Sequence, residues 1–368
     1  MPSERASFAD RRARAAARLR ECDLAALLVA PSADLFYLTG YQMHTSERLT
    51  CLVLDREGKA TLVCPALEEP RAAAAAPELS RTTWQETEDP FAKAASLVEG
   101  KGAIAVGDQM WASFVLRLQS GLPGQEFRVA SEVTRTLRVR KDRHERDALR
   151  LVAESADRAY ARMRERSFAG RTEREVGAEL AGLLREEGHD EVGFTIVGSG
   201  PNGASPHHDT GDRRIARGDT VVLDFGGGMN GYRSDITRTV TVGPATDPER
   251  QRVHDTVRRA QEAGYAGARA GATAESIDAA SRAVIDEAGY GKYFIHRTGH
   301  GIGLDGHEHP YLVHGNRETL EPGMAFSIEP GIYLPGRFGV RIEDIAIIGD
   351  DGTVVPLNRA DHSFAIVS

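Results

Sequence analysis

The sequence predicts two domains, of which the first belongs to the α/β class. Its 368 residues are too many for one typical hydrophobic core and suit two domains. In the first third, apolar runs of strand length alternate with helical stretches, which is typical of an α/β domain. The stretch 138–145, Arg-Val-Arg-Lys-Asp-Arg-His-Glu, is densely charged. We therefore predict a boundary there, with one domain over residues 1–138 and a second over residues 139–368.

The first domain is expected to begin with an amphipathic helix over residues 1–20. This stretch is rich in Arg and Ala, lacks the apolar centre of a signal peptide, and carries Glu4 and Asp10. Apolar runs of strand length follow at 24–31, 49–54, 60–64 and 103–107. The Asp-Arg-Glu-Gly sequence between the second and third runs predicts a hairpin.

The second domain is expected to open with two helices. Apolar residues recur at helical spacing from Leu149 to Met163. The next helix has a capping-box sequence, Thr172-Glu-Arg-Glu175, at its start. The remaining predicted elements are a strand over 193–198 and helices over 248–269 and 274–288.

Composition narrows the class of protein. The net charge is −8 and the isoelectric point is about 5.9, which disfavours nucleic acid as the main partner because phosphate binding needs a basic face. No apolar run reaches the ~18 residues of a membrane span, so no membrane partner is expected. The three cysteines, Cys22, Cys51 and Cys64, lack metal-ligand spacing and indicate a reducing, cytoplasmic location.

Two aspartates are the first candidate metal ligands. Asp224 lies in the apolar run Val-Val-Leu-Asp-Phe, and Asp235 follows in Tyr-Arg-Ser-Asp-Ile-Thr. The Gly-Gly-Gly-Met-Asn-Gly stretch between them is a hairpin signal. Because a hairpin returns the second strand beside the first, we expect the two carboxylates to face one another.

A second cluster of polar residues lies nearer the C-terminus. His296, His300 and His307 recur at short spacing among glycines, and Glu329 and Glu343 each end a short apolar run. Glycine allows a backbone to approach a ligand closely, so the arrangement suggests metal ligands carried by strands and their loops. For any one of these residues alone, a turn or loop role is the simpler interpretation.

The joint pattern favours a metal site. Burial of Asp224, Glu329 and Glu343 in apolar strands without a partner would cost on the order of several kcal/mol for each ion, and a shared cation removes that cost. Four carboxylates and one imidazole suit a pair of divalent cations of the manganese, cobalt or zinc kind. Oxygen-rich ligation favours manganese over a structural zinc, which prefers Cys and His.

The order and flanks of these residues resemble a known family of metallopeptidases. His-Arg-Thr-Gly-His-Gly-Ile-Gly, Ile-Glu-Pro-Gly-Ile-Tyr and Val-Arg-Ile-Glu-Asp are similar to motifs of the proline-specific pita-bread metallopeptidases, Xaa-Pro aminopeptidase and Xaa-Pro dipeptidase (prolidase). The resemblance is strong from about residue 141 onward and weaker before it. It implies an α/β creatinase-like N-terminal domain followed by an α+β pita-bread catalytic domain. The metal ligands that it implies are Asp224, Asp235, His300, Glu329 and Glu343.

The resemblance also implies an activity, the hydrolysis of the Xaa-Pro bond at the N-terminus of dipeptides or short peptides. Two divalent metal ions per subunit would lower the pKa of a bridging water, and Glu329 would take its proton. His207, which follows Asn-Gly-Ala-Ser-Pro, would hold the peptide carbonyl. His296 and His307 would bind the substrate and pass a proton to the leaving proline nitrogen.

Several assignments stay open at the level of sequence. The doublet of His207 and His208 is ambiguous, and loop alignment favours His207. Arg341 lies two residues before a ligand glutamate and so on the same face of a strand. It would hold a ligand carboxylate or close a proton relay, and a salt bridge at the rim of the site is the alternative. His309 and His314 match no family position and are expected at the surface.

One departure from the family bears on the substrate. Some prolidases carry an arginine shortly after the position of His307, which grips the free carboxylate of a dipeptide. This chain has Glu308-His-Pro-Tyr311 there, so the sequence leaves dipeptidase and aminopeptidase activity open.

The sequence leaves two other functions open and predicts an assembly state. Another dimetal C–N hydrolase on the same fold is one alternative, since fold does not settle substrate. A non-catalytic peptide-binding module is the other, and the complete ligand set disfavours it. Residues 34–41 resemble a segment that reaches a partner subunit's active site in relatives, so a homodimer is expected. For Phe36 and Tyr37 themselves, a role in the core is the simpler interpretation.

Overall fold

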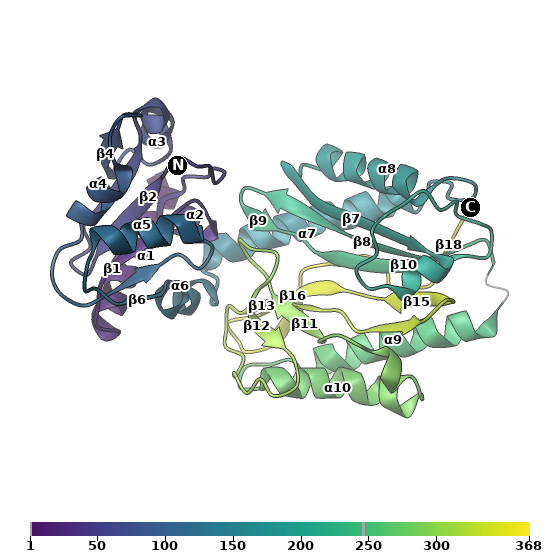
Figure 1. Ribbon diagram of the computed structural model, residues 1–368. Coiled ribbons are helices and arrows are strands. Elements are labelled where there is room, and N and C mark those ends of the chain that lie inside the picture. Colours follow the sequence, from purple (N-terminus) through teal and green to yellow (C-terminus); the bar gives the residue numbers. More distant parts are fainter. Residues whose placement is uncertain (1, 245–246) are drawn as a thin grey trace. The chain divides into compact units, whose positions relative to one another are not determined.

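The chain divides into two compact units, Met1–Arg138 and Val139–Ser368 (Figure 1). The computed structural model describes residues 2–244 and 247–368, with side chains from residue 8 onward. Each unit has its own sheet structure and its own hydrophobic core.

The first unit is built on a mixed sheet in the order β4-β3-β2-β1-β5-β6. Its strands are β1 (Leu24–Val29), β2 (Cys51–Asp55), β3 (Ala60–Pro65), β4 (Ser80–Trp84), β5 (Ala103–Val106) and β6 (Phe127–Val129). Its helices are α1 (Pro2–Glu21), α2 (Ala33–Thr39), η1 (Ala66–Glu68), α3 (Glu69–Ala75), α4 (Pro90–Ser96), α5 (Ala112–Gly121) and α6 (Ser131–Arg138). The pairs β1–β2 and β2–β3 are antiparallel, and β1–β5, β5–β6 and β3–β4 are parallel.

The central strand of this sheet explains why its sequence is a continuous apolar run. All residues of β1 are buried, because the strand pairs on both edges and is covered on both faces. A strand with one solvated face would alternate apolar and polar residues instead.

Helix α2 carries the segment that was expected to reach a partner subunit. Ser32 caps its start, and Gly40 ends it with a φ of 72°, a conformation that glycine adopts without strain. The Asp34 carboxylate accepts hydrogen bonds from Thr134 Oγ1 at 2.9 Å and Arg138 Nη1 at 2.8 Å within the same unit. Tyr37 is fully buried, which agrees with a core role for that residue.

The second unit contains three sheets with helices on their outer sides. Their strand orders are β18-β10-β8-β7 with β9 beside β8, β12-β11-β13-β16-β17, and β14-β15. The strands of the first sheet are β7 (Glu191–Ser199), β8 (Thr220–Met229), β9 (Tyr232–Arg233), β10 (Ile236–Val242) and β18 (Ala365–Val367). The other strands are β11 (Gly299–Gly301), β12 (Glu308–Leu312), β13 (Ala325–Ile328), β14 (Gly331–Leu334), β15 (Phe338–Arg341), β16 (Asp344–Ile348) and β17 (Val354–Pro356).

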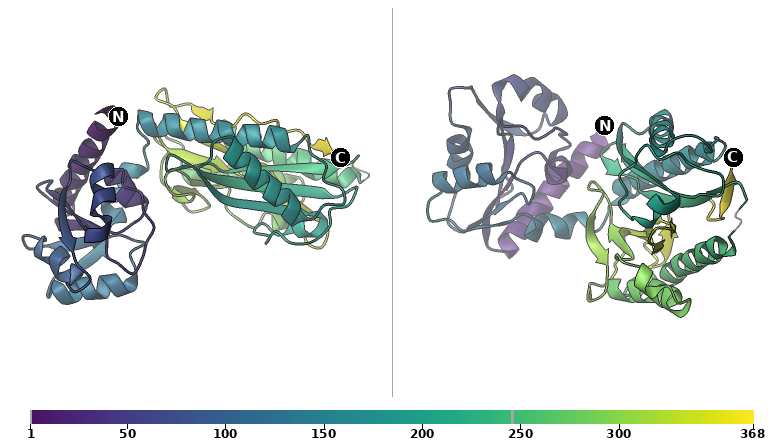
Figure 2. Two further views of the ribbon diagram at one scale, coloured as in Figure 1. Left: turned by 90° about the horizontal axis from the view of Figure 1, so that it is seen from above. Right: turned by 45° about the vertical axis from the view of Figure 1, so that its right-hand side comes forward.

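The helices of the second unit are α7 (Arg143–Met163), α8 (Glu173–Glu186), η2 (Gly200–Ala204), α9 (Pro248–Gly267), α10 (Ala274–Glu287) and η3 (Gly291–Tyr293). Both α7 and α8 begin with capping boxes, from Asp142 to Glu145 and from Thr172 to Glu175. The right-hand view of Figure 2 shows the strands of this unit between α7 and α8 on one side and α9 and α10 on the other. One core lies under α7 and α8, and separate clusters lie under α10 and α9.

The predicted aspartate hairpin is present, but its turn lies later than the glycine run. The residues of Gly226–Gly228 lie inside β8, and the chain reverses at Asn230 and Gly231, with φ values of 52° and 84°. A Cβ atom on Gly226 would lie 2.1 Å from the Ser234 carbonyl oxygen. Because Gly226 has no side chain, the Ser234 backbone can pack closely against β8, and Asn230-Gly231 makes the turn.

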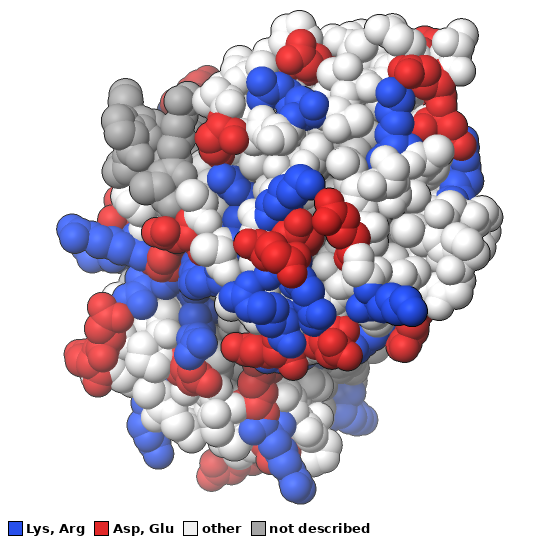
Figure 3. All heavy atoms as spheres, turned by 90° about the vertical axis from the view of Figure 1, so that its left-hand side faces the viewer, with Lys and Arg blue, Asp and Glu red and all other residues white. Residues whose placement is uncertain are grey.

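The surface of the molecule carries cations beside anions. Arg48 pairs with Glu86 at 2.8 Å and Lys59 with Glu99 at 3.2 Å. On the face drawn in Figure 3, blue and red side chains lie next to one another. Among the residues that the structure describes, no helix is both long and apolar enough to cross a membrane.

Candidate metal centre

The five predicted ligands come together where two sheets of the second unit meet. Asp224 lies in β8 and Asp235 directly precedes β10, while His300 lies in β11, Glu329 follows β13 and Glu343 precedes β16. The two aspartates therefore come from one sheet and the other three side chains from the next. An isolated β-bridge between Thr237 and Glu343 links the two sheets at this seam.

The ligand atoms are grouped closely without pairing directly. His300 Nε2 lies 3.6 Å from Asp235 Oδ2, 3.4 Å from Glu329 Oε1 and 4.0 Å from Glu343 Oε1. Oxygens of Asp224, Asp235 and Glu343 lie within 4.8 Å of one another. Most of these separations are long for hydrogen bonds, and they suit side chains arranged around cations.

The electrostatics of the cluster fit divalent metal ions. Asp224 Oδ1 is buried and has no hydrogen-bond partner among the described residues. Burial, and then the charges of Asp224 and Glu329, raise the pKa of Asp235 well above its usual value. Burial raises the pKa of Glu329 to about 7, and burial and the neighbouring carboxylates raise that of Glu343. Bound cations would favour the charged forms of all these groups.

Hydrogen bonds orient the imidazole ligand and its neighbours. His300 Nδ1 lies 3.0 Å from the Gly301 carbonyl oxygen, which assigns the proton to Nδ1 and leaves the Nε2 lone pair facing the carboxylates. The backbone N–H of His300 donates to Ser327 Oγ at 3.1 Å, and Ser327 Oγ donates to Glu329 Oε1 at 3.3 Å. Burial, and then the nearby His307, lower the pKa of His300 to about 3, so the ring is neutral, as a metal ligand must be.

Arg341 is buried beneath the ligands, with 3% exposure. Its guanidinium group donates to Asp224 Oδ2, to Thr237 Oγ1 at 3.0 Å and to Tyr333 Oη at 2.7 Å. His296 Nε2 lies 2.9 Å from the same tyrosine hydroxyl. The arginine therefore holds a ligand carboxylate from the interior, and the geometry does not match a salt bridge at the rim.

His307 lies against the ligand histidine. The ring centroids of His307 and His300 are 3.8 Å apart, and one ring nitrogen of His307 lies within 4.8 Å of ligand atoms of His300 and Asp235. Arg297 Nη2 donates to His307 Nδ1 at 3.2 Å, and the Arg297 guanidinium stacks 4.3 Å above the ring centroid of Tyr311. Burial, and then the charge of Arg297, lower the pKa of His307.

The histidine doublet is divided between two environments. His207 lines the metal cavity, whereas His208 Nε2 lies 2.8 Å from Glu173 Oε2. The structure thus brings His207 to the site. His314 is exposed as expected, and His309 is partly exposed in strand β12.

The predicted ligands open into a cavity of about 510 Å³. It is lined by Phe194, Ile196, Pro206, His207, Asp224, Asp235, His296, Arg297, His300, His307, Glu329, Arg341 and Glu343. Every side chain that the sequence nominated as ligand or catalytic residue is in this set. The sequence did not nominate Arg297 or Tyr333, although both lie within the quoted His-Arg-Thr-Gly-His and Ile-Glu-Pro-Gly-Ile-Tyr motifs.

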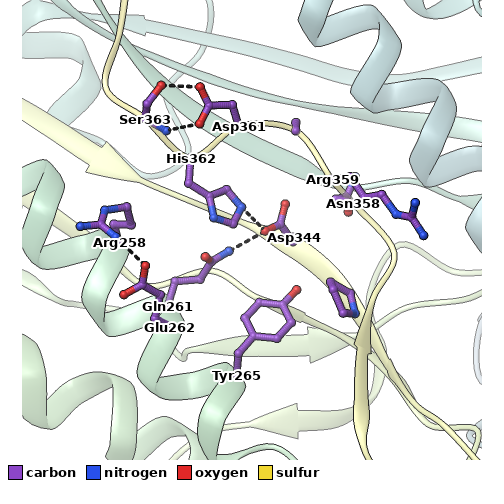
Figure 4. Close-up of a pocket in the computed structure, with 12 residues that line it drawn as sticks. Arg258, Gln261, Glu262, Tyr265, Asp344, Asn358, Arg359, Asp361, His362 and Ser363 are labelled. Atoms are coloured by element: carbon purple, nitrogen blue, oxygen red, sulfur yellow. Dashed lines mark hydrogen bonds and ion pairs between the residues drawn. The ribbon is translucent and has the colours of Figure 1, made fainter.

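The residue after Glu343 points to a second cavity, of about 790 Å³ (Figure 4). Asp344 accepts hydrogen bonds from Gln261 Nε2 at 2.8 Å and Arg238 Nη2 at 2.6 Å, and His362 Nε2 lies 2.6 Å away. Burial alone would raise the pKa of Asp344, but Arg238 holds it below its usual range. Arg238 also donates to the Glu343 carbonyl oxygen at 2.7 Å, so this cluster fixes the main chain of a predicted metal ligand.

Comparison with known proteins agrees with the fold. Residues 127–350 match the model of metallopeptidase family M24, and residues 11–140 match the creatinase/prolidase N-terminal domain. A protein of Mycobacterium tuberculosis named "Probable dipeptidase PepE" is 46% identical over 365 residues, which are 98% of this chain and 96% of that protein. The Xaa-Pro dipeptidase of Lactobacillus delbrueckii subsp. lactis is 35% identical over 345 residues, 91% of this chain and 93% of that protein.

A solved structure extends the comparison to the backbone. The crystal structure of dipeptidase PepE from Mycobacterium ulcerans matches with a TM-score of 0.92 and 43% identity, over 99% of this chain and 98% of that chain. The match confirms the predicted fold class, an α/β creatinase-like domain followed by an α+β pita-bread catalytic domain. This chain belongs to metallopeptidase family M24.

Proposed function

We propose that this protein is a metal-dependent exopeptidase that hydrolyses the Xaa-Pro bond at the N-terminus of dipeptides or short peptides. The observation that carries the proposal is the seam of Asp224, Asp235, His300, Glu329 and Glu343, grouped around one cavity. Family membership supports it, and so does the relative that is named an Xaa-Pro dipeptidase.

The ligand set would hold two divalent cations, for which we propose manganese, with cobalt or zinc as alternatives. When bound, such ions lower the pKa of a bridging water and polarise the scissile carbonyl. Glu329 would accept the proton of the attacking water, a general-base role that typically contributes about 10²–10⁴-fold. Arg341 holds Asp224 in place by donating to its carboxylate.

The leaving group sets a second requirement. The nitrogen of a proline peptide bond carries no proton, so it must be protonated to leave. His307 lies beside His300 and accepts a hydrogen bond from Arg297, which supports a role for His307 in delivering that proton. His207 lines the cavity and is available to hold the substrate carbonyl.

Arg297 bears on the length of the substrate. The arginine that some prolidases carry after His307 is replaced by the stretch from Glu308 to Tyr311, and Glu308 pairs away from the site with Lys141 at 2.6 Å. Arg297 stacks on Tyr311 and also lines the cavity. Its guanidinium group would meet the free carboxylate of a dipeptide, so we propose that dipeptides are preferred.

Assembly and location complete the proposal. We propose a homodimer and a cytoplasmic location. The resemblance of residues 34–41 to a partner-reaching segment supports the dimer, although Asp34 itself is bound within its own unit. Exposed residues that directly follow, such as Gln42 and His44, are the ones free to approach a partner. Three cysteines that form no disulfide support the location.

The substrate proposal is tested by a hydrolysis panel. Protein reconstituted with manganese, cobalt or zinc is assayed on Xaa-Pro dipeptides, their C-terminal amides, Xaa-Pro tripeptides and dipeptides without proline. We expect Xaa-Pro dipeptides to be cleaved fastest, and manganese to support the highest rate. Equal or faster cleavage of dipeptides without proline would contradict the proline specificity and favour a general dipeptidase.

The metal proposal predicts a stoichiometry and a loss of activity. Elemental analysis after gentle reconstitution should find close to two ions per subunit, because four carboxylates and one imidazole are more ligands than one ion needs. Asp224→Asn should lose most activity and metal while keeping its fold. Asp212→Asn, at an exposed aspartate paired with Arg174, is the matched control. A fully active protein with one bound ion per subunit would contradict the proposal of two cations that share bridging carboxylates.

The proton-donor role predicts a dependence on the leaving group. His307→Ala should lower turnover of an Xaa-Pro peptide far more than it lowers metal content. The loss should shrink on an activated Xaa-Pro-type anilide, whose leaving group needs no protonation. His314→Ala, at an exposed histidine of the same unit, should change neither rate. An equal loss on both substrates, with a lower melting temperature, would assign His307 to packing.

The assembly proposal predicts the mass of a dimer in solution. Sedimentation velocity at micromolar concentration should give one species of about twice the chain mass of 39.9 kDa. A fully active monomer at that concentration would contradict the proposed homodimer.

A further inference from the structure

A buried carboxylate at the start of helix α8 collects an unusual number of hydrogen bonds. The Glu173 side chain has 0% exposure. Ser199 donates to Glu173 Oε1 through its backbone N–H at 2.8 Å and through its hydroxyl at 2.6 Å, and Asn202 Nδ2 lies 3.0 Å away. His208 Nε2 at 2.8 Å and the Gly211 N–H at 3.4 Å approach Oε2. All of these donors belong to the stretch 199–211.

These contacts keep the carboxylate charged. Burial alone would raise the pKa of Glu173, but the hydrogen bonds from Ser199, His208 and Asn202 lower it below its usual value. The carboxylate also lies in the first turn of a helix, where the backbone N–H groups favour negative charge. A fixed buried anion is thus the centre to which the stretch 199–211 is attached.

The same stretch carries His207 into the metal cavity. On one side of His207, the Pro206 carbonyl oxygen accepts a hydrogen bond from Arg341 Nη1 at 3.3 Å. On the other side, His208 is held by Glu173. His207 is therefore fixed through both of its chain neighbours, one tied to the metal centre and one tied to α8.

We propose that Glu173 is a positioning residue for the peptidase reaction, and that it acts by holding His208 so that His207 faces the substrate. The proposal rests on the proposed function. Glu173 does not line the metal cavity, so its effect must pass through the stretch 199–211. A displacement of about 1 Å in a group that contacts substrate can cost about 10²-fold in rate.

A purely structural role for Glu173 makes a different prediction. A residue that only stabilises the fold would lower activity by the same factor whether or not His207 is present. A residue that acts through His207 would have little further effect once that imidazole is removed. A double-mutant cycle separates the two, because residues that act as a unit are not additive.

The experiment compares Glu173→Gln, His207→Ala and the double variant on one Xaa-Pro dipeptide. The amide of Gln keeps the size of the side chain but turns one acceptor oxygen into a donor that faces other donors. We expect Glu173→Gln to lower kcat/KM about 10- to 100-fold in the native background and less than about 2-fold in the His207→Ala background. Metal content should stay unchanged in all variants.

The matched control is Glu175→Gln. This residue lies two positions later in the same helix, and its side chain caps the backbone N–H of Thr172 from an exposed position. It should leave kcat/KM within about 2-fold, since Gln also completes a capping box. Equal losses from Glu173→Gln in both backgrounds would overturn the proposal and assign Glu173 to fold stability.

Two provisions keep the outcome decisive. If Glu173→Gln does not fold, Glu173→Asp, which keeps the charge but shortens the reach, takes its place in the same cycle with the same criterion. If the native protein hydrolyses no Xaa-Pro substrate, the proposed function fails by itself. The positioning claim is then read from a crystal structure of the variant, where His207 should leave the cavity, and an unmoved His207 would overturn it.

Discussion

The concentration of acidic side chains at one buried seam is the constraint on which the catalytic unit depends. Asp224, Asp235, Glu329 and Glu343 converge from two sheets, and their burial raises the pKa of three of them. A core of apolar residues would not tolerate four such groups without compensating charge. Divalent cations are the compensation that this geometry suits, so the proposed catalytic site would also make the two sheets compatible.

Two arginine side chains hold the residues of this seam in position. Arg341 donates to Asp224 beneath the cavity, and Arg238 donates to Asp344 and to the main chain of Glu343 from the other side. Both arginines are almost fully buried, and both are bound at several atoms, as the planar guanidinium group allows. Protein contacts therefore help to hold the proposed metal ligands in position, which favours rigid geometry at the site.

The sequence could nominate the candidate ligands because their signals are local, and it missed partners that only the fold brings together. Asp224 and Asp235 lie on one hairpin, so alternation and a turn suffice to pair them. The predicted hairpin stretch, residues 226–231, contains the turn at its end, at Asn230 and Gly231. Gly226 is needed instead where the backbone passes Ser234. Glu173 was recognised only as part of a capping-box stretch. Its donors are 26 or more residues away along the chain, and no periodicity reports such a contact.

The directions of the hydrogen bonds distinguish the two histidines that flank His300. A guanidinium group only donates, so Tyr333 Oη accepts from Arg341 and uses its own proton toward His296 Nε2. His296 then carries its proton on Nδ1, 2.7 Å from the Arg297 carbonyl oxygen, and has none to give to a substrate.

For His307, the rule that a guanidinium group only donates assigns the ring proton to the other nitrogen, Nε2. Arg297 donates to His307 Nδ1, which leaves the ring proton of neutral His307 on Nε2. We infer that His307 donates from Nε2 to the leaving nitrogen, and that the proton which Glu329 takes from the attacking water replaces the one that His307 gives up. His296 instead anchors the Tyr333 hydroxyl, so two histidines that look equivalent in the sequence have different protonation patterns.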